Sequence, residues 1–203
     1  MNSQLRFDSV DALRGMTVAA MLLVNNPGDW GHVYAPLLHS EWHGCTPTDL
    51  VFPFFLFIVG VSIALGIVPR VEAGADTAAL RRNVLLRAAK IIGLGLTLHL
   101  LAFLLLDMAW FRPWGVLQRI GLCFGVVGLL ALMTRARARW LLIASILLGY
   151  WGLLAAGGSF EPWINLASRI DTALLGPIVY QFDPVTGLGH EPEGLLSTLP
   201  AIA

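Results

Sequence analysis

Hydrophobic residues occur along this chain in long, almost uninterrupted blocks. A helix needs roughly 20 apolar residues to cross a bilayer core of about 30 Å. Five blocks approach that length, and we expect each to be a transmembrane helix: 10–26, 49–68, 84–106, 115–133 and 140–156. The pattern predicts an all-α, polytopic transmembrane helix bundle.

A sixth apolar block begins at Gly194 and runs through 194–203. A helix that stopped inside a bilayer would leave its last carbonyls unpaired. We therefore expect residues 1–203 to form one transmembrane domain that is incomplete at its C-terminus, the N-terminal part of a longer protein.

Basic residues are grouped in two of the links between the blocks. Cytoplasmic segments carry an excess of Lys and Arg, so these two links are predicted to be cytoplasmic, as is the N-terminus. The loops 27–48 and 157–193 are predicted to be external, since the first has no Lys or Arg and the second only Arg169. The cytoplasmic groups are Arg70, Arg81, Arg82, Arg87 and Lys90 between and just inside the second and third blocks, and Arg135, Arg137 and Arg139 between the fourth and fifth.

Composition supports an integral membrane protein. Hydrophobic residues make up 57% of the chain and charged residues 13%, against roughly 25% charged in a typical soluble domain. The mean hydropathy is +0.73. The net charge of zero gives no reason to expect nucleic-acid binding, which needs clustered positive charge. Cys45 and Cys123 do not make a disulfide framework.

Several polar residues fall in the outer third of the predicted bundle. Polar groups at that depth usually face a cavity or a partner, so we expect an external polar cavity, the default candidate for a site. These residues are Asn25, Asn26, His39, His43, Asp49, His99, Asp107, Gln118 and Arg119.

Structural interpretations stay open for some of them. Arg119 is either neutralised by Asp49 or Asp107 or binds substrate, and the two are compatible. Asp49 precedes an apolar run and fits a helix N-cap. His99 on an apolar helix is more often a core histidine than a catalyst. Arg14 follows Asp11 by three residues, which favours a structural pair on one helix face.

The loop histidines allow three chemical interpretations. His39 and His43 have the spacing of metal ligands, but HSEWH places its glutamate wrongly for the H-E-x-x-H motif and no third ligand stands out. Cys45 beside His43 is a weaker candidate for a thiol nucleophile. A histidine acting as general base or transient nucleophile is the third. The residues alone do not separate that role from a plain surface histidine.

Four segments carry a resemblance to a known family: SVDALRGMTVAAMLLVNNPG, LLHSEWHGCTPTDLVFPFFLFIVGVS, GVLQRIGLCF and EPEGLLSTLPAIA. The chain resembles the heparan-α-glucosaminide N-acetyltransferase family, multi-spanning enzymes that take acetyl groups from cytosolic acetyl-CoA and deliver them to sugars across the membrane. The resemblance implies acetyl-CoA as donor substrate and no metal. It implies as partners the lipid bilayer, acetyl-CoA and a carbohydrate acceptor, without nucleic acid and with a homodimer left open.

The same resemblance implies roles for individual residues. His39 matches the family histidine held to be catalytic, ahead of the W-x-G and DLVFP elements that contain Trp42 and Asp49. Asn25 fits an active-site asparagine, Arg14 the arginine of a D-x-x-R-G element, and Gln118 with Arg119 an L-Q-R element. The expected sets are His39, Asn25 and Asp49 for catalysis, Arg119, Gln118, Arg14, Arg87 and Lys90 for the donor, and Trp42, His43 and Trp30 for the acceptor.

Of three departures from the family pattern, the missing N-terminal region indicates a compact bacterial-type member in the inner (plasma) membrane. His43 stands where the lysosomal enzyme has asparagine, and Asn26, Pro27 and Gly28 replace a glycine-rich stretch. The large luminal N-terminal region of the lysosomal enzyme is absent. The first two departures leave the acceptor open.

Three alternatives remain at this point. The basic residues 81–90 are either a dock for the phosphates of acetyl-CoA or ordinary positive-inside bias. The outer aromatics either stack on a sugar or form the interfacial belt, and the belt is favoured for Trp110 and Trp114. A transporter or flippase is the alternative function, for which Pro53 and Gly60 would break a helix, although the chain shows no convincing repeat.

Overall fold

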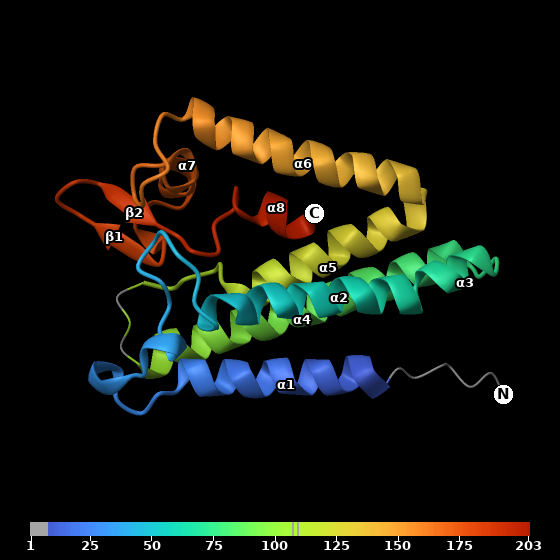
Figure 1. Ribbon diagram of the computed structural model, residues 1–203, viewed down its shortest axis with the longest axis horizontal. Coiled ribbons are helices and arrows are strands. Elements are labelled where there is room, and N and C mark those ends of the chain that lie inside the picture. The colour runs from blue at the N-terminus through green and yellow to red at the C-terminus, as the bar shows by residue number, and fades with distance from the viewer. Residues whose placement is uncertain (1–7, 107, 109) are drawn as a thin grey trace. The chain divides into compact units, whose positions relative to one another are not determined.

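The computed structural model describes residues 8–106, 108 and 110–203. Helices dominate the described part of the chain, and one two-stranded sheet accompanies them (Figure 1). The chain divides into two compact units, Met1–Gly66 and Ile67–Ala203, which we call unit 1 and unit 2. Asp107, one of the predicted outer polar residues, lies outside the described residues.

Unit 1 is a pair of packed helices joined by a long loop. The helices are α1 (Asp8–Asn25) and α2 (Val51–Gly66), and the loop contains three 3-10 turns, η1 (Trp30–His32), η2 (Ala35–Leu37) and η3 (Thr48–Leu50). Arg14 donates one hydrogen bond to Asp11 at 2.9 Å and another to Ser62 Oγ at 3.0 Å. The bond to Asp11 agrees with the structural pair expected on one helix face, and the bond to Ser62 in addition ties α1 to α2.

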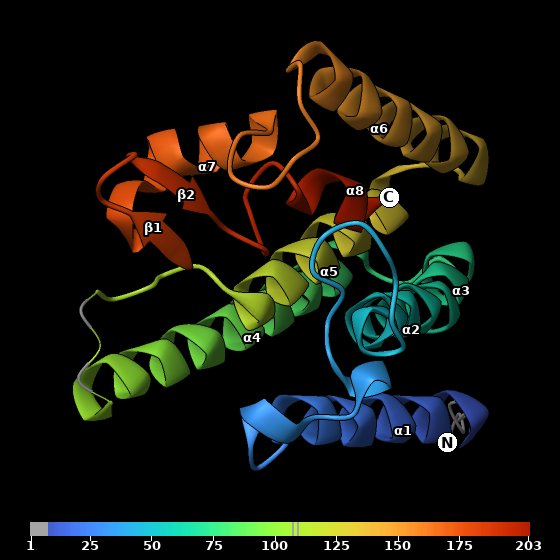
Figure 2. The ribbon, with the colours of Figure 1, turned by 60° about the vertical axis from the view of Figure 1, so that its left-hand side comes forward.

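Unit 2 combines long apolar helices with a small folded segment. The first group is α3 (Val68–Glu72), α4 (Thr77–Leu105), α5 (Val116–Met133) and α6 (Ala136–Ala156). The second group is α7 (Leu166–Leu175), η4 (Gly176–Ile178), β1 (Gln181–Asp183), β2 (Leu188–His190) and α8 (Thr198–Ile202). The two strands are antiparallel, with Gln181 opposite His190. Figure 2 shows α4 and α5 lying side by side.

Glycines on α5 let it approach α4 closely. A Cβ at Gly121 would lie 2.6 Å from Ile92 Cγ1, and one at Gly128 would lie 2.7 Å from Val84 Cγ1. Small residues at such interfaces allow membrane helices to pack by van der Waals contact. These contacts also fix the antiparallel register, in which the start of α4 lies beside the end of α5.

The predicted transmembrane bundle is confirmed, with corrections to its elements. Four helical segments are long and apolar enough to cross a membrane among the residues that the structure describes: Thr48–Glu72, Thr77–Leu105, Val116–Met133 and Ala136–Ala156. The first predicted span is helical, but α1 is not one of the four because it carries Asp8, Asp11 and Arg14. The predicted external loop 157–193 is not a simple loop, since it contains α7 and the hairpin.

Candidate functional site

His39 and Asp49 form a direct pair in the loop of unit 1. The distance between His39 Nδ1 and Asp49 Oδ1 is 2.7 Å. The other carboxylate oxygen accepts hydrogen bonds from the main-chain amides of Thr46 at 2.8 Å and Ser40 at 3.2 Å. The N-cap interpretation of Asp49 is therefore wrong, because the carboxylate binds the loop that precedes it and not the first turn of α2.

The pair sets the chemistry of the imidazole. A carboxylate bound at Nδ1 favours the tautomer with hydrogen on that nitrogen, which leaves Nε2 as a proton acceptor. The His39 side chain is 68% exposed, whereas that of Asp49 is 24% exposed. The arrangement can therefore accept a proton from, or form a bond to, a molecule that approaches from solvent.

Four other predicted site residues of unit 1 lie in this loop or at the end of α1, and their side chains are exposed. Trp30 is 65% exposed and Trp42 38% exposed, and His43 is also exposed. Asn25, at the end of α1, donates from Nδ2 to the carbonyl of Met21 at 3.0 Å. The structure thus brings His39 and Asp49 into contact and leaves the predicted acceptor residues open to solvent.

A second His–Asp pair lies in the same loop. His32 Nδ1 is 2.5 Å from Asp29 Oδ2, and Asp29 also accepts from the amide of Gly31 at 2.8 Å. These two contacts lower the pKa of Asp29 below its usual value. Both side chains are largely exposed, so this pair stabilises the η1 turn locally.

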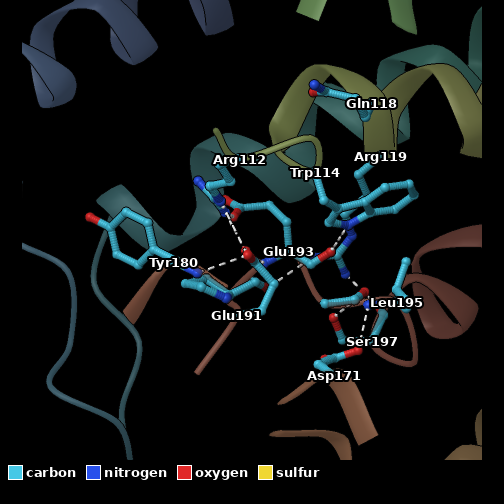
Figure 3. Close-up of polar contacts among 12 residues, drawn as sticks. Arg112, Trp114, Gln118, Arg119, Asp171, Tyr180, Glu191, Glu193, Leu195 and Ser197 are labelled. Atoms are coloured by element: carbon cyan, nitrogen blue, oxygen red, sulfur yellow. Dashed lines mark hydrogen bonds and ion pairs between the residues drawn. The ribbon is translucent and has the colours of Figure 1, made fainter. Parts of the chain in front are cut away.

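Unit 2 holds a separate polar network around residues 191–198, which we call the Glu191 turn (Figure 3). Arg112 binds the carboxylates of both Glu191 and Glu193, with Arg112 Nε 3.1 Å from Glu191 Oε2. The guanidinium also lies 4.8 Å from the centroid of the Tyr180 ring. Burial raises the pKa of Glu191, and the Glu193 carboxylate acts in the same direction, while Arg112 opposes both.

Helices α5 and α7 hold the same turn from two directions. Arg119 on α5 donates to the carbonyls of Pro192 at 3.2 Å and Ser197 at 2.6 Å. Asp171 on α7 accepts from the amide of Leu195 at 2.8 Å. A Cβ at Gly194 would overlap Asp171 Oδ2, so this close approach requires glycine. The partners of Arg119 named here are main-chain carbonyls, and its predicted role in donor binding stays a prediction.

Gln118 and His99 meet at the α4–α5 interface. His99 Nδ1 lies 2.6 Å from the carbonyl of Arg112, and Gln118 Nε2 lies 3.5 Å from the same nitrogen. Gln118 is 2% exposed. His99 therefore has a main-chain partner, which agrees with its interpretation as a core histidine.

The predicted phosphate dock divides into different environments. The Arg87 guanidinium lies 5.3 Å from the centroid of the Phe124 ring on α5, so it makes a packing contact between helices. Lys90, Arg81 and Arg82 are exposed. Within the described ranges, no group of three or more His, Cys, Asp and Glu side chains is arranged to hold a metal ion. Cys45 and Cys123 are free thiols.

Sequence reasoning missed most of the network around the Glu191 turn. Arg112, Asp171 and Glu191 are not among the residues that the sequence indicates for the site, although the letters EPEG at 191–194 carry part of the family resemblance. The acids of the predicted external loop were available as a signal, since a buried carboxylate needs a partner. The sequence does not indicate which basic residue is the partner of Glu191.

Comparison with known proteins identifies the family. Residues 6–181 match the family model described as heparan-alpha-glucosaminide N-acetyltransferase, catalytic. The human protein heparan-alpha-glucosaminide N-acetyltransferase is 30% identical over 246 aligned positions, covering 97% of this chain and 36% of the human protein. The mouse protein of that name is 35% identical over 127 positions, covering 62% of this chain and 19% of the mouse protein. The chain thus spans about a third of the human relative's length. The chain is an integral membrane protein that belongs to the heparan-α-glucosaminide N-acetyltransferase catalytic family.

Proposed function

We propose that this protein is a membrane-embedded acetyltransferase. It moves an acetyl group from acetyl-CoA on the cytosolic side to an amine or hydroxyl group of a sugar on the external side. Membership of the family supports the class of reaction over transport. The observation that carries the proposal is the contact of 2.7 Å between His39 Nδ1 and Asp49 Oδ1 beside an exposed imidazole face.

The proposed reaction is direct transfer with His39 as general base. The acceptor nitrogen or oxygen attacks the thioester carbon, so that a C–N or C–O bond forms and the C–S bond breaks. His39 Nε2 takes the acceptor's proton and passes it to the sulfur of the departing CoA. Asp49 stabilises the imidazolium that forms between these two steps.

The neighbouring residues supply supporting roles in this proposal. Asn25 donates one amide hydrogen to Met21, and its second hydrogen is proposed to stabilise the oxyanion of the tetrahedral intermediate. Trp30, Trp42 and His43 are proposed to contact the acceptor sugar, since aromatic faces stack on sugar rings. Among the residues proposed for the donor, Arg14, Arg87 and Arg119 have protein partners. Lys90, which is exposed, is therefore the first of them to substitute.

The central experiment measures transfer from radiolabelled acetyl-CoA to amino-sugar and neutral-sugar acceptors by the purified protein. Substitution His39→Ala should lower the rate by about 10²- to 10⁴-fold, the usual contribution of a general base. Asp49→Asn should lower it as well, because the amide no longer fixes the tautomer. His32→Ala is the matched control, a histidine of the same loop that pairs with Asp29, has no role in the proposed reaction and should keep most of the rate. Full turnover by His39→Ala in folded protein would refute the assignment.

A trapping experiment separates direct transfer from a covalent route. The protein is incubated with acetyl-CoA alone, quenched and digested, and the peptide that contains His39 is examined by mass spectrometry. Direct transfer predicts no acetylated peptide, whereas an acetyl-histidine intermediate predicts one that is lost in His39→Ala. Binding of acetyl-CoA without hydrolysis or transfer to any acceptor would count against the enzyme and in favour of a transporter.

A further inference from the structure

One end of unit 2 collects arginines from three elements, and we call this set the basic end. The register of α4 and α5 places the start of α4 beside the end of α5, and α6 follows directly. Figure 1 shows α3, the start of α4 and the link between α5 and α6 at the same end of the unit. The five members of the basic end are Arg70 in α3, Arg81 and Arg82 in α4, and Arg135 and Arg137 at the start of α6.

The fold itself does not use these five charges. All five side chains are exposed, and none makes a hydrogen bond, ion pair or ring contact with any residue in the part of the chain that the structure describes. Of the nearby acids, Asp76 is engaged as the cap of α4, where it accepts from the amide of Ala78 at 2.9 Å. Like charges repel when they are gathered at one place, so the arrangement suits an anionic ligand.

The distribution of the arginines indicates what kind of anion fits. A guanidinium matches the geometry of phosphate oxygens. A single nucleotide needs cations that converge on one site, but these five come from three elements and all point into solvent. An extended array of exposed cations fits a surface that presents many phosphates.

The position of the array indicates a membrane surface. Its residues flank the ends of α4, α5 and α6, all of which are long and apolar enough to cross a bilayer. Trp140, one residue after Arg139, is 72% exposed, and tryptophan is enriched at the level of lipid headgroups. The guanidiniums therefore lie where the phosphates of a bilayer would be expected.

We propose that the basic end binds the phosphate groups of anionic phospholipids in the leaflet that adjoins it. Arginines near an anionic lipid surface each contribute about fivefold to binding. Arg81 and Arg82 also belong to the basic residues 81–90, for which a phosphate dock is one interpretation, whereas Arg70, Arg135 and Arg137 lie outside that range. The proposed binding of lipid does not depend on acetyl transfer.

Native mass spectrometry of the full chain tests the proposal. The detergent-solubilised protein is titrated with phosphatidylglycerol or with phosphatidylcholine, and bound lipid is counted. The double variant Arg135→Gln with Arg137→Gln should bind phosphatidylglycerol about 25-fold more weakly, from two contributions of about fivefold, and should bind phosphatidylcholine as the parent does. Arg169→Gln is the matched control, since Arg169 is exposed on α7 and should leave both lipids unchanged.

Three results would overturn the proposal. Equal binding of the two lipids by the parent protein would show that charge is not recognised. Unchanged phosphatidylglycerol binding in the double variant would place the lipid elsewhere. Displacement of phosphatidylglycerol by added CoA would assign these arginines to the nucleotide. If the double variant does not fold, Arg82→Gln and Arg135→Gln are measured singly, and each should weaken phosphatidylglycerol binding about fivefold.

Discussion

The two ends of unit 2 use arginine in opposite ways. Arg112 and Arg119 lie at what we call the turn end, where they bind the carboxylates and carbonyls of the Glu191 turn. The arginines of the basic end are exposed and have no partner within the described residues. The difference follows from burial, since the Arg112 side chain is only 19% exposed.

Removing a charge from water is costly unless other groups replace its hydration. At the turn end, Glu191, Glu193 and main-chain carbonyls supply that replacement, and the arginines thereby hold the turn in place. At the basic end, water supplies it, so the guanidiniums stay available to a ligand. We therefore expect the arginines of the turn end to contribute to stability and those of the basic end to contribute to ligand binding.

The largest expected effect comes from Arg112→Ala. The substitution leaves the Glu191 side chain, which is 0% exposed, without its cation, and breaking a buried ion pair in this way costs about 3–5 kcal/mol. Unfolding of the detergent-solubilised protein by heat, followed by circular dichroism, measures the loss. Arg137→Ala is the control and should change stability by less than about 0.5 kcal/mol. Equal losses in the two variants would abolish the distinction between the ends.

A smaller effect is expected from Gly194→Ala. The new Cβ would overlap Asp171 Oδ2, and overpacking of this kind costs about 1–3 kcal/mol. The rate of hydrogen exchange should rise at the main-chain amides of Leu195 and Leu196, which donate hydrogen bonds to Asp171. Gly149→Ala is the control, because nothing lies within 4 Å of its Cβ position and alanine favours a helix over glycine by about 0.5–1 kcal/mol. Unchanged exchange at Leu195 would mean that Asp171 does not hold the turn.

The long helices were predictable because each needs only one signal, a sustained apolar run. The apolar pattern predicts a loop at 157–193 because α7 has only 10 residues and mixes polar with apolar positions, so it contains no long apolar run. The close packing of α4 on α5 also went unpredicted. Glycines at 121, 125 and 128 share one helix face, but the sequence does not indicate which helix packs against that face.

Only the individual residues of the candidate site, and not the contacts between them, could be predicted. The family resemblance makes His39 and Asp49 catalytic candidates, but an irregular loop has no periodicity that would predict the contact between them. Arg112 and Glu191 are 79 positions apart, and nothing local in the sequence pairs them. Contacts of this kind form only in the tertiary structure, so the local sequence does not predict them.

The turn end should also be the end that responds to pH. Burial lowers the pKa of His190 below its ordinary value of 6.5. The unfolded chain then binds the proton more readily, so the contribution of His190 to stability is complete above about pH 6.5 and is lost as the pH falls toward the lower folded pKa. The expected loss between pH 7.5 and 5.5 is less than about 1.4 kcal/mol.

Comparison of melting temperatures at those two pH values, for the parent and for His190→Gln, isolates this contribution. The variant should lose less stability on acidification than the parent. Asp171 titrates with the opposite sign, because burial raises its pKa, but it is present in both proteins and cancels in the comparison. An identical change of melting temperature with pH in parent and variant would show that His190 does not cause the loss of stability at low pH.

The smallest expected effect is a salt response at the basic end. Raising the ionic strength from 0.1 to 1 M shortens the Debye length from about 10 Å to about 3 Å. The exposed arginines then repel one another less, while the buried pair of Arg112 and Glu191 is screened much less. Relative to Arg81→Gln with Arg135→Gln, the parent should therefore gain about 0.2–0.5 kcal/mol in high salt, measured as the difference in thermal unfolding. A parent that loses stability relative to this variant in high salt would indicate that the arginines at this end are paired with acids and not with solvent.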